Sequence, residues 1–269
     1  MSNVVRVPGA GTPPASGRVS YLRTARVLIQ LAWARTVSPV LLLAVAGLLL
    51  LPMIFALVFA SRGTLSGDPV TFLVQRYDTL VCALATPLIA LLLGTSAFSA
   101  EAEDGTLLYL VTTTTPRWWI AAVRVLYAAL VTGVLSAASV WGTGLIAAGH
   151  SNPEQVTSAF TVAVFFGGVA YAALFTALAL TTRRALVSGL LYVLFWEGVL
   201  SATFPALHYL SVRQWMLAVA AALTSVSDAR LASGPGVTTS LVGALLLVTV
   251  AIYVGGRHLH QPRISRVGT

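Results

Sequence analysis

Six apolar stretches constrain this chain more than any other feature, because each is long enough to cross a lipid bilayer as a helix. The hydrocarbon core of a bilayer is about 30 Å thick, and a helix rises about 1.5 Å per residue. Of the 269 residues, 57% are hydrophobic and only 9% are charged, too few charges to cover the surface of a soluble domain. We therefore expect an all-α integral membrane protein with six transmembrane spans, near residues 39–60, 79–98, 118–146, 157–181, 185–204 and 237–255.

Prolines and glycines give local detail within this plan. A side chain that caps helices stands just before a proline in three places: Ser38-Pro39, Thr115-Pro116 and Asn152-Pro153. Pro52 and Pro87 fall inside spans and predict bends. Close packing of helices is expected at five small residues: Gly133, Gly142, Gly144, Gly167 and Gly168.

The arginines set the expected orientation, because cytoplasmic loops of membrane proteins carry an excess of basic residues. If the spans alternate in direction, one side of the membrane holds twelve arginines: Arg6, Arg18, Arg23, Arg26, Arg35, Arg117, Arg124, Arg183, Arg184, Arg257, Arg263 and Arg266. The other side holds Arg62, Arg76, Arg213 and Arg230. We therefore expect both termini in the cytoplasm. This bias accounts for most of the net charge of +8 without a nucleic-acid partner.

The segment before the first span has an amphipathic pattern. Arg23 and Arg26 would share one face of a helix, and apolar side chains including Trp33 would share another. We interpret it as a helix lying at the membrane interface; the alternative is an extension of the first span. The expected divisions are a disordered cytoplasmic tail (1–20), an amphipathic interfacial helix (21–37), the transmembrane domain (38–256) and a cytoplasmic tail (257–269).

The segment between the fifth and sixth spans, residues 205–236, does not fit a simple loop. It is apolar from His208 to Thr224 except around Arg213 and Gln214. A seventh span would bury the arginine and place the C-terminal arginines outside the cell, both of which are unfavourable. We therefore expect an extracellular re-entrant or surface helix.

Several kinds of chemistry are excluded by residue type. The 16 basic residues other than histidine are all arginine, so the chain has no lysine for a Schiff base or for the phosphate-binding loop of an ATPase. Cys82 is the single cysteine and cannot form an internal disulfide. His258 and His260 lack further metal ligands in the tail. We expect no catalytic residue, no metal site and no cofactor bound by this chain.

The connection between the second and third spans is unusual, because Glu101, Glu103 and Asp104 lie on the side where arginines gather. Asp104 can cap a short helix that starts near Gly105, and Thr115-Pro116 can start the next span. The apolar residues on one face of the short helix would be Leu107, Leu110 and Val111. The residues predict a short amphipathic cytoplasmic helix; the alternative is a solvated turn.

Together with the topology, this connection resembles that of the permease subunits of type-2 ABC exporters. In that family an acidic stretch, a Gly-Thr-Leu and a Thr-Pro followed by a basic residue link the second and third of six spans. The matching residues are Glu101, Glu103, Gly105, Thr106, Leu107, Thr115, Pro116 and Arg117. The resemblance covers most of the chain, but Leu108 stands where family members often have a second glutamate.

The resemblance implies a multi-pass protein of the bacterial cell membrane that forms half of a dimer, with a second copy or a homologue. ATP and Mg would bind a separate ATPase subunit, and substrate would be exported by alternating access. The segment from Glu101 to Arg117, including Asp104 and Leu110, would couple this chain to the ATPase. Arg183 and Arg184 would make a second ATPase contact or act only as topology determinants. Two alternatives stay open: a membrane subunit that regulates or senses without transport, and a membrane-embedded lipid-modifying enzyme.

Glu197 is the acid that the expected spans place deepest in the membrane. A carboxylate there costs several kcal/mol unless it is paired or neutralised, so it is a functional candidate. Glu197 and Arg213 are our candidates for a pathway or gate. The structural alternative is that Glu197 is protonated, or is tied to Arg213 or His208 in the following segment.

Overall fold

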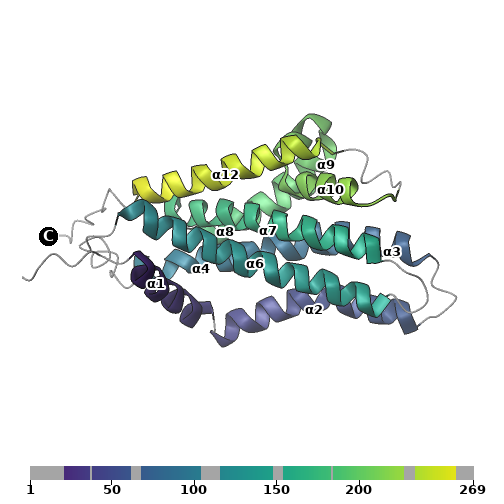
Figure 1. The fold of residues 1–269 in the computed structure, drawn as a ribbon, viewed down its shortest axis with the longest axis horizontal. Helices are drawn as coiled ribbons and strands as arrows, with labels where there is room; N and C mark the ends of the chain where they lie inside the picture. The colour runs from purple at the N-terminus through teal and green to yellow at the C-terminus, as the bar shows by residue number, and fades with distance from the viewer. Residues whose placement is uncertain are drawn as a thin grey trace, which may run out of the picture.

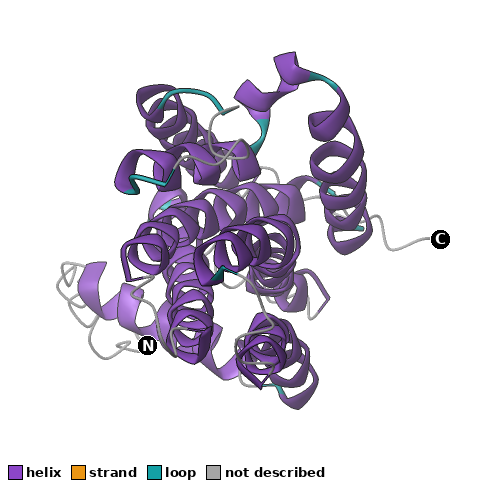
Figure 2. Ribbon diagram, turned by 90° about the vertical axis from the view of Figure 1, so that its right-hand side faces the viewer, coloured by secondary structure: helices purple, strands orange, loops and turns teal. Residues whose placement is uncertain are grey.

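The computed structural model describes residues 21–36, 38–61, 68–103, 116–147, 154–182, 184–226 and 234–258. Every regular element in these residues is helical, and the long helices lie side by side along the longest axis of the molecule (Figures 1 and 2). Five helices in the described part are long and apolar enough to cross a membrane: Pro39–Ser61, Val70–Ser96, Trp118–Ala147, Gln155–Thr181 and Val237–Arg257. The chain is thus built as an all-α protein with apolar helices of membrane-spanning length.

The N-terminal segment forms helix α1 (Tyr21–Thr36), at the position where an amphipathic helix is expected. Leu28 of α1 is buried against Ile120 and Val123, whereas Trp33 remains 59% exposed. Helix α1 lies at the end of the bundle where α12 (Val237–His258) finishes (Figure 1). It is separate from α2 (Pro39–Ser61), which begins at the Ser38-Pro39 pair.

The second long helical run starts ten residues earlier than expected, at Pro69 rather than residue 79. It comprises α3 (Pro69–Arg76), a π-helical segment η2 (Tyr77–Ala85) and α4 (Thr86–Glu103). The Asp68 carboxylate accepts hydrogen bonds from the backbone N–H of Thr71, at 2.9 Å, and from its hydroxyl, at 2.8 Å. These bonds lower the pKa of Asp68 below its usual value. Asp68-Pro69 is therefore a fourth capping residue followed by proline.

Helices α6 (Arg117–Ala147) and α7 (Glu154–Thr181) form the centre of the bundle. Helix α7 contacts α4, α6, α10 and α12, whereas α2 and α12 lie at the periphery (Figure 1). Most of the apolar side chains of α2 and α12 are not buried within the protein. The backbones of α6 and α7 approach closely where two glycines face each other: a Cβ added at Gly168 would lie 3.0 Å from Cα of Gly133. The close packing predicted for these glycines is confirmed.

The predicted fifth span is helical from Ala185 to Thr203, but its interior differs from the long spans. It consists of α8 (Ala185–Leu191), a second π-helical segment η3 (Tyr192–Leu200) and the short α9 (Ser201–Thr203). Its apolar part, Ala185–Leu200, is shorter than the five long helices. The helical content is as expected, whereas a sixth membrane crossing stays a proposal.

After α9 the chain forms the 3-10 helix η4 (Pro205–Leu210) and then α10 (Val212–Leu223). Met216 of α10 packs at Gly167, near the middle of α7, and Ser225 just after α10 bonds Gln155 at the start of α7. Helix α10 therefore runs antiparallel to the first half of α7, and its N-terminus lies inside the bundle. Its side chains are buried from Gln214 to Ala220, so α10 enters the bundle and does not lie on its surface.

Candidate functional site

The predicted coupling segment is only partly described by the structure. Glu101 and Glu103 fall in the last turn of α4, Pro116 directly precedes α6, and Arg117 is its first residue. Helices α4 and α6 contact each other, so both ends of the connection are attached to packed helices. The other coupling candidates lie outside the described residues: Asp104, Gly105, Thr106, Leu107, Leu110 and Thr115. The short helix itself stays a prediction.

The second predicted contact, Arg183 and Arg184, lies between α7 and α8. Arg183 is outside the described residues, and Arg184 is exposed just before α8 begins. An exposed arginine at a helix junction suits an electrostatic contact and equally suits a topology determinant. The two interpretations of this pair therefore both stay open.

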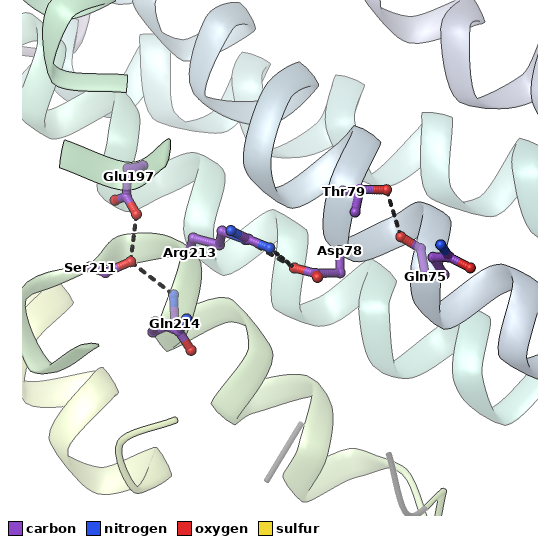
Figure 3. A network of polar contacts seen from close by, with 7 residues as sticks. All are labelled: Gln75, Asp78, Thr79, Glu197, Ser211, Arg213 and Gln214. Atoms are coloured by element: carbon purple, nitrogen blue, oxygen red, sulfur yellow. Dashed lines mark hydrogen bonds and ion pairs between the residues drawn. The ribbon is translucent and has the colours of Figure 1, made fainter. Parts of the chain in front are cut away.

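A buried cluster of charged and polar side chains lies where α10 meets the two π-helical segments (Figure 3). The guanidinium of Arg213 donates two hydrogen bonds to Oδ1 of Asp78, from Nε at 3.0 Å and from Nη2 at 2.7 Å. Asp78 belongs to η2 and is 4% exposed. The ion pair thus ties the first turn of α10 to the second helical run.

Glu197 of η3 is held by the start of the same helix. Its carboxylate accepts hydrogen bonds from the Ser211 hydroxyl, from the Val212 backbone N–H at 3.0 Å and from the Tyr192 hydroxyl at 3.3 Å. The Ser211 hydroxyl also accepts the Gln214 N–H at 3.2 Å, so Ser211 is the N-cap of α10. The N-terminus of a helix carries free N–H groups and partial positive charge, which suits a carboxylate.

Local backbone geometry explains why these groups meet. In a π-helix, residues five apart are close on the same face, and Tyr192 and Glu197 are separated by five positions within η3. Ser211 has an extended backbone with φ −96° and ψ 121°, which turns the chain from η4 into α10. The indole N–H of Trp215 donates to the Tyr209 carbonyl at 2.9 Å and fixes the same turn.

Sequence reasoning found Glu197 and Arg213 but not their partners. Of the structural alternatives for Glu197, the tie to Arg213 is not the one that forms, because the Arg213 guanidinium bonds Asp78 on another helical run. Asp78 was missed as a buried acid because the second span was expected to begin at residue 79. The Asp68-Pro69 pair is the signal that could have placed Asp78 inside the helix.

The cluster contains two acids and one arginine, and both acids accept hydrogen bonds from the first turn of α10. The Asp78–Arg213 pair is internally neutral, whereas the hydrogen bonds to Glu197 described above come from uncharged donors. Near Glu197, Trp196 Nε1, Ser201 Oγ and Gln214 Oε1 are buried without a hydrogen-bond partner in the protein. No group of three or more His, Cys, Asp or Glu residues in the described part is arranged to hold a metal ion.

Comparison of the chain with protein-family models and with curated proteins finds no match. A functional proposal therefore depends on the residues of the α4–α6 connection and on the arrangement of the helices. The buried cluster adds the electrostatic features that such a proposal has to explain.

Proposed function

We propose that this chain is the transmembrane permease subunit of an ATP-driven type-2 ABC exporter. It dimerises with a second copy or a homologue to form the substrate pathway, and it couples to separate ATPase subunits by alternating access. The observation that carries the proposal is the connection from Glu101 to Arg117, in which acids, Gly-Thr-Leu and Thr-Pro-Arg join two packed apolar helices. ATP and Mg belong to the ATPase, and this chain is not an enzyme.

The attachment of this connection supports a role in transmitting force. Its two ends continue directly into α4 and α6, and α4 also packs on α7. A movement of the ATPase against the connection would therefore reach three of the long helices through direct contacts. An ordinary solvated turn would not require three acidic residues on the side of the membrane where most arginines lie.

The exposed apolar side chains support a membrane environment and a dimer. Many large hydrophobic residues on α2, α8, η3 and α12 are more than half exposed, including Leu43, Leu191, Phe195 and Leu245. In water such a surface would aggregate, whereas lipid tails and a second permease subunit would cover it. We place the protein in the bacterial cell membrane with six spans and both termini in the cytoplasm.

The coupling role predicts the effect of removing the acids. Replacing Glu101, Glu103 and Asp104 together by alanine should leave membrane insertion intact, because the three acids follow the apolar span Val70–Ser96 in the chain. Co-purification of the ATPase subunit from the membrane, or the ATP hydrolysis rate of the reconstituted complex, should fall by about tenfold or more if these charges dock the ATPase. Unchanged co-purification with an unchanged hydrolysis rate would contradict the coupling role and favour the alternative of a solvated turn. If the unchanged complex binds the ATPase but exports no substrate, the alternative of a regulatory membrane subunit is favoured instead.

The orientation can be tested with single cysteines in a chain carrying Cys82→Ala. Cysteines at Ser66, Asn152 and Gly234 should react with a membrane-impermeant thiol reagent added outside intact cells, because the arginine bias places them outside. Cysteines at Thr113 and Ser265 should react only after the cells are opened. The reverse labelling pattern would contradict the topology.

A further inference from the structure

In the described residues, the polar bonds that hold helix α10 to other helices differ between its inner and its outer end. Its first turn receives the Asp78–Arg213 ion pair and the hydrogen bonds of Glu197 to Ser211 and Val212. Beyond its last turn, the Ser225 hydroxyl bonds the Gln155 side chain at an exposed position. Among the described residues, the polar bonds to α10 are therefore concentrated at the end that lies deepest in the bundle.

The two acids share an unusual backbone setting. Asp78 lies in η2 and Glu197 in η3, the two π-helical segments of the described residues, and η2 and η3 contact each other. Insertions of π-helical geometry into α-helices are often found at functional sites. The start of α10 thus bridges two segments whose backbones already depart from the regular helix.

A buried ion pair contributes specificity of position more than stability. Desolvation of Asp78 and Arg213 offsets most of their attraction, and an apolar pair of similar size would hold the helix as well or better. In this docked position, with the start of α10 against η2 and η3, the buried Ser201 Oγ and Gln214 Oε1 also have no hydrogen-bond partner in the protein. These features suit a contact that forms in one state and is broken in another, because the docked state is well defined but not strongly favoured.

We infer that Asp78, Glu197 and the first turn of α10 form a latch, and that its release lets the inner end of α10 move away from η2 and η3 during the transport cycle. This inference rests on the proposed function and deepens it, because it assigns the gate to a named helix and adds Asp78 as a positioning residue. Asp78 and Glu197 then act on the pathway through α10, and Arg213 and Ser211 are the groups that they hold.

The docked position can be measured without transport, by cross-linking α10 to α7. A Cβ at Gly167 would lie 2.2 Å from Cγ of Met216, so Gly167→Cys with Met216→Cys brings two thiols within bridging distance in a Cys82→Ala chain. In lipid nanodiscs without nucleotide, the added change Asp78→Asn or Glu197→Ala should slow disulfide formation about tenfold or more, because one partner of a buried contact is removed. The matched control is Asp68→Asn, an acid in the same helical run that is exposed, which should leave the rate unchanged. An unchanged rate in both test variants would overturn the latch.

The movement itself is tested by locking it in the complex with the ATPase subunit. Oxidation of the Gly167→Cys, Met216→Cys complex should abolish most ATP hydrolysis, and a reductant should restore it. The control pair Gly167→Ala with Met216→Ala fills the same positions and should respond to neither reagent. Hydrolysis at the parent rate in the oxidised, fully cross-linked complex would show that α10 stays docked throughout the cycle, which contradicts the release step. If no ATPase subunit assembles with this chain, the proposed function is contradicted. The cross-linking rates, which are measured on the chain alone, would still test whether Asp78 and Glu197 hold α10.

Discussion

Replacing Arg213 by methionine is expected to lower the stability of the protein by about 3 kcal/mol, because the Asp78 carboxyl group would be left in a buried position without its hydrogen-bonding partner. Replacing Asp78 by leucine should cost a similar amount, since the Arg213 guanidinium would then be left unpaired. The Asp78 side chain is 6% exposed and that of Arg213 is 19% exposed, so solvent would compensate little of the loss. Both losses should appear as lower thermal midpoints of the chain in lipid nanodiscs.

The double variant, Asp78→Leu with Arg213→Met, separates this pair from independent effects. With neither charge present, most of the stability should return, so the loss in the double variant should be smaller than the sum of the two single losses by more than about 3 kcal/mol. Gln75 provides the matched control, because it lies one turn before Asp78 (Figure 3) and is an exposed residue. Gln75→Leu combined with Arg213→Met should give the sum of its single effects. Simple additivity in the Asp78 pair would contradict the ion pair.

The same double variant separates stability from function. If the pair only anchors α10, the stable double variant should hydrolyse ATP at the parent rate in the complex with its ATPase. If the pair is a latch that has to open and close, hydrolysis should stay low although the thermal midpoint has recovered. A recovered midpoint with a recovered rate would therefore restrict Asp78 and Arg213 to a structural role.

The second large effect is expected at the contact between α6 and α7. Replacing Gly168 by leucine should destabilise the protein by about 3 kcal/mol or prevent its folding, because overpacking at a close helix contact forces the backbones apart. Even the Cβ of an alanine would lie 3.0 Å from Cα of Gly133 and 3.1 Å from its N, and backbone atoms cannot rotate away. Gly168→Ala should therefore show a smaller loss in the same direction.

Gly47 is the control for this prediction. A Cβ at Gly47 of α2 has no neighbouring atom within 4 Å, so the space beside it is open. Gly47→Leu should leave the thermal midpoint unchanged or raise it slightly, because glycine is a weak helix former. Equal midpoints for the Gly168→Leu and Gly47→Leu variants, measured in the same nanodiscs, would show that the α6–α7 approach is less close than described.

The sequence alone determined where most of the long helices lie. Runs of apolar residues must become helices in lipid, because each backbone N–H and C=O has to be bonded within the segment. For that reason the ends of α2, α6, α7 and α12 fall within about three residues of the expected spans. The expectation failed at α3, where Gln75, Arg76 and Asp78 interrupt the apolar run although the Asp68 cap has already started the helix.

Only the tertiary structure decided how the buried charges are paired. The sequence placed Glu197 and Arg213 near each other in the chain, and an ion pair between them was one of the alternatives that it left open. In the fold, Arg213 reaches Asp78, 135 positions away, and the N-terminus of α10 takes the Glu197 carboxylate. The N-terminus of α10 meets Glu197, and Arg213 meets Asp78, only once α10 has entered the bundle, so no local pattern of residues could have indicated this arrangement.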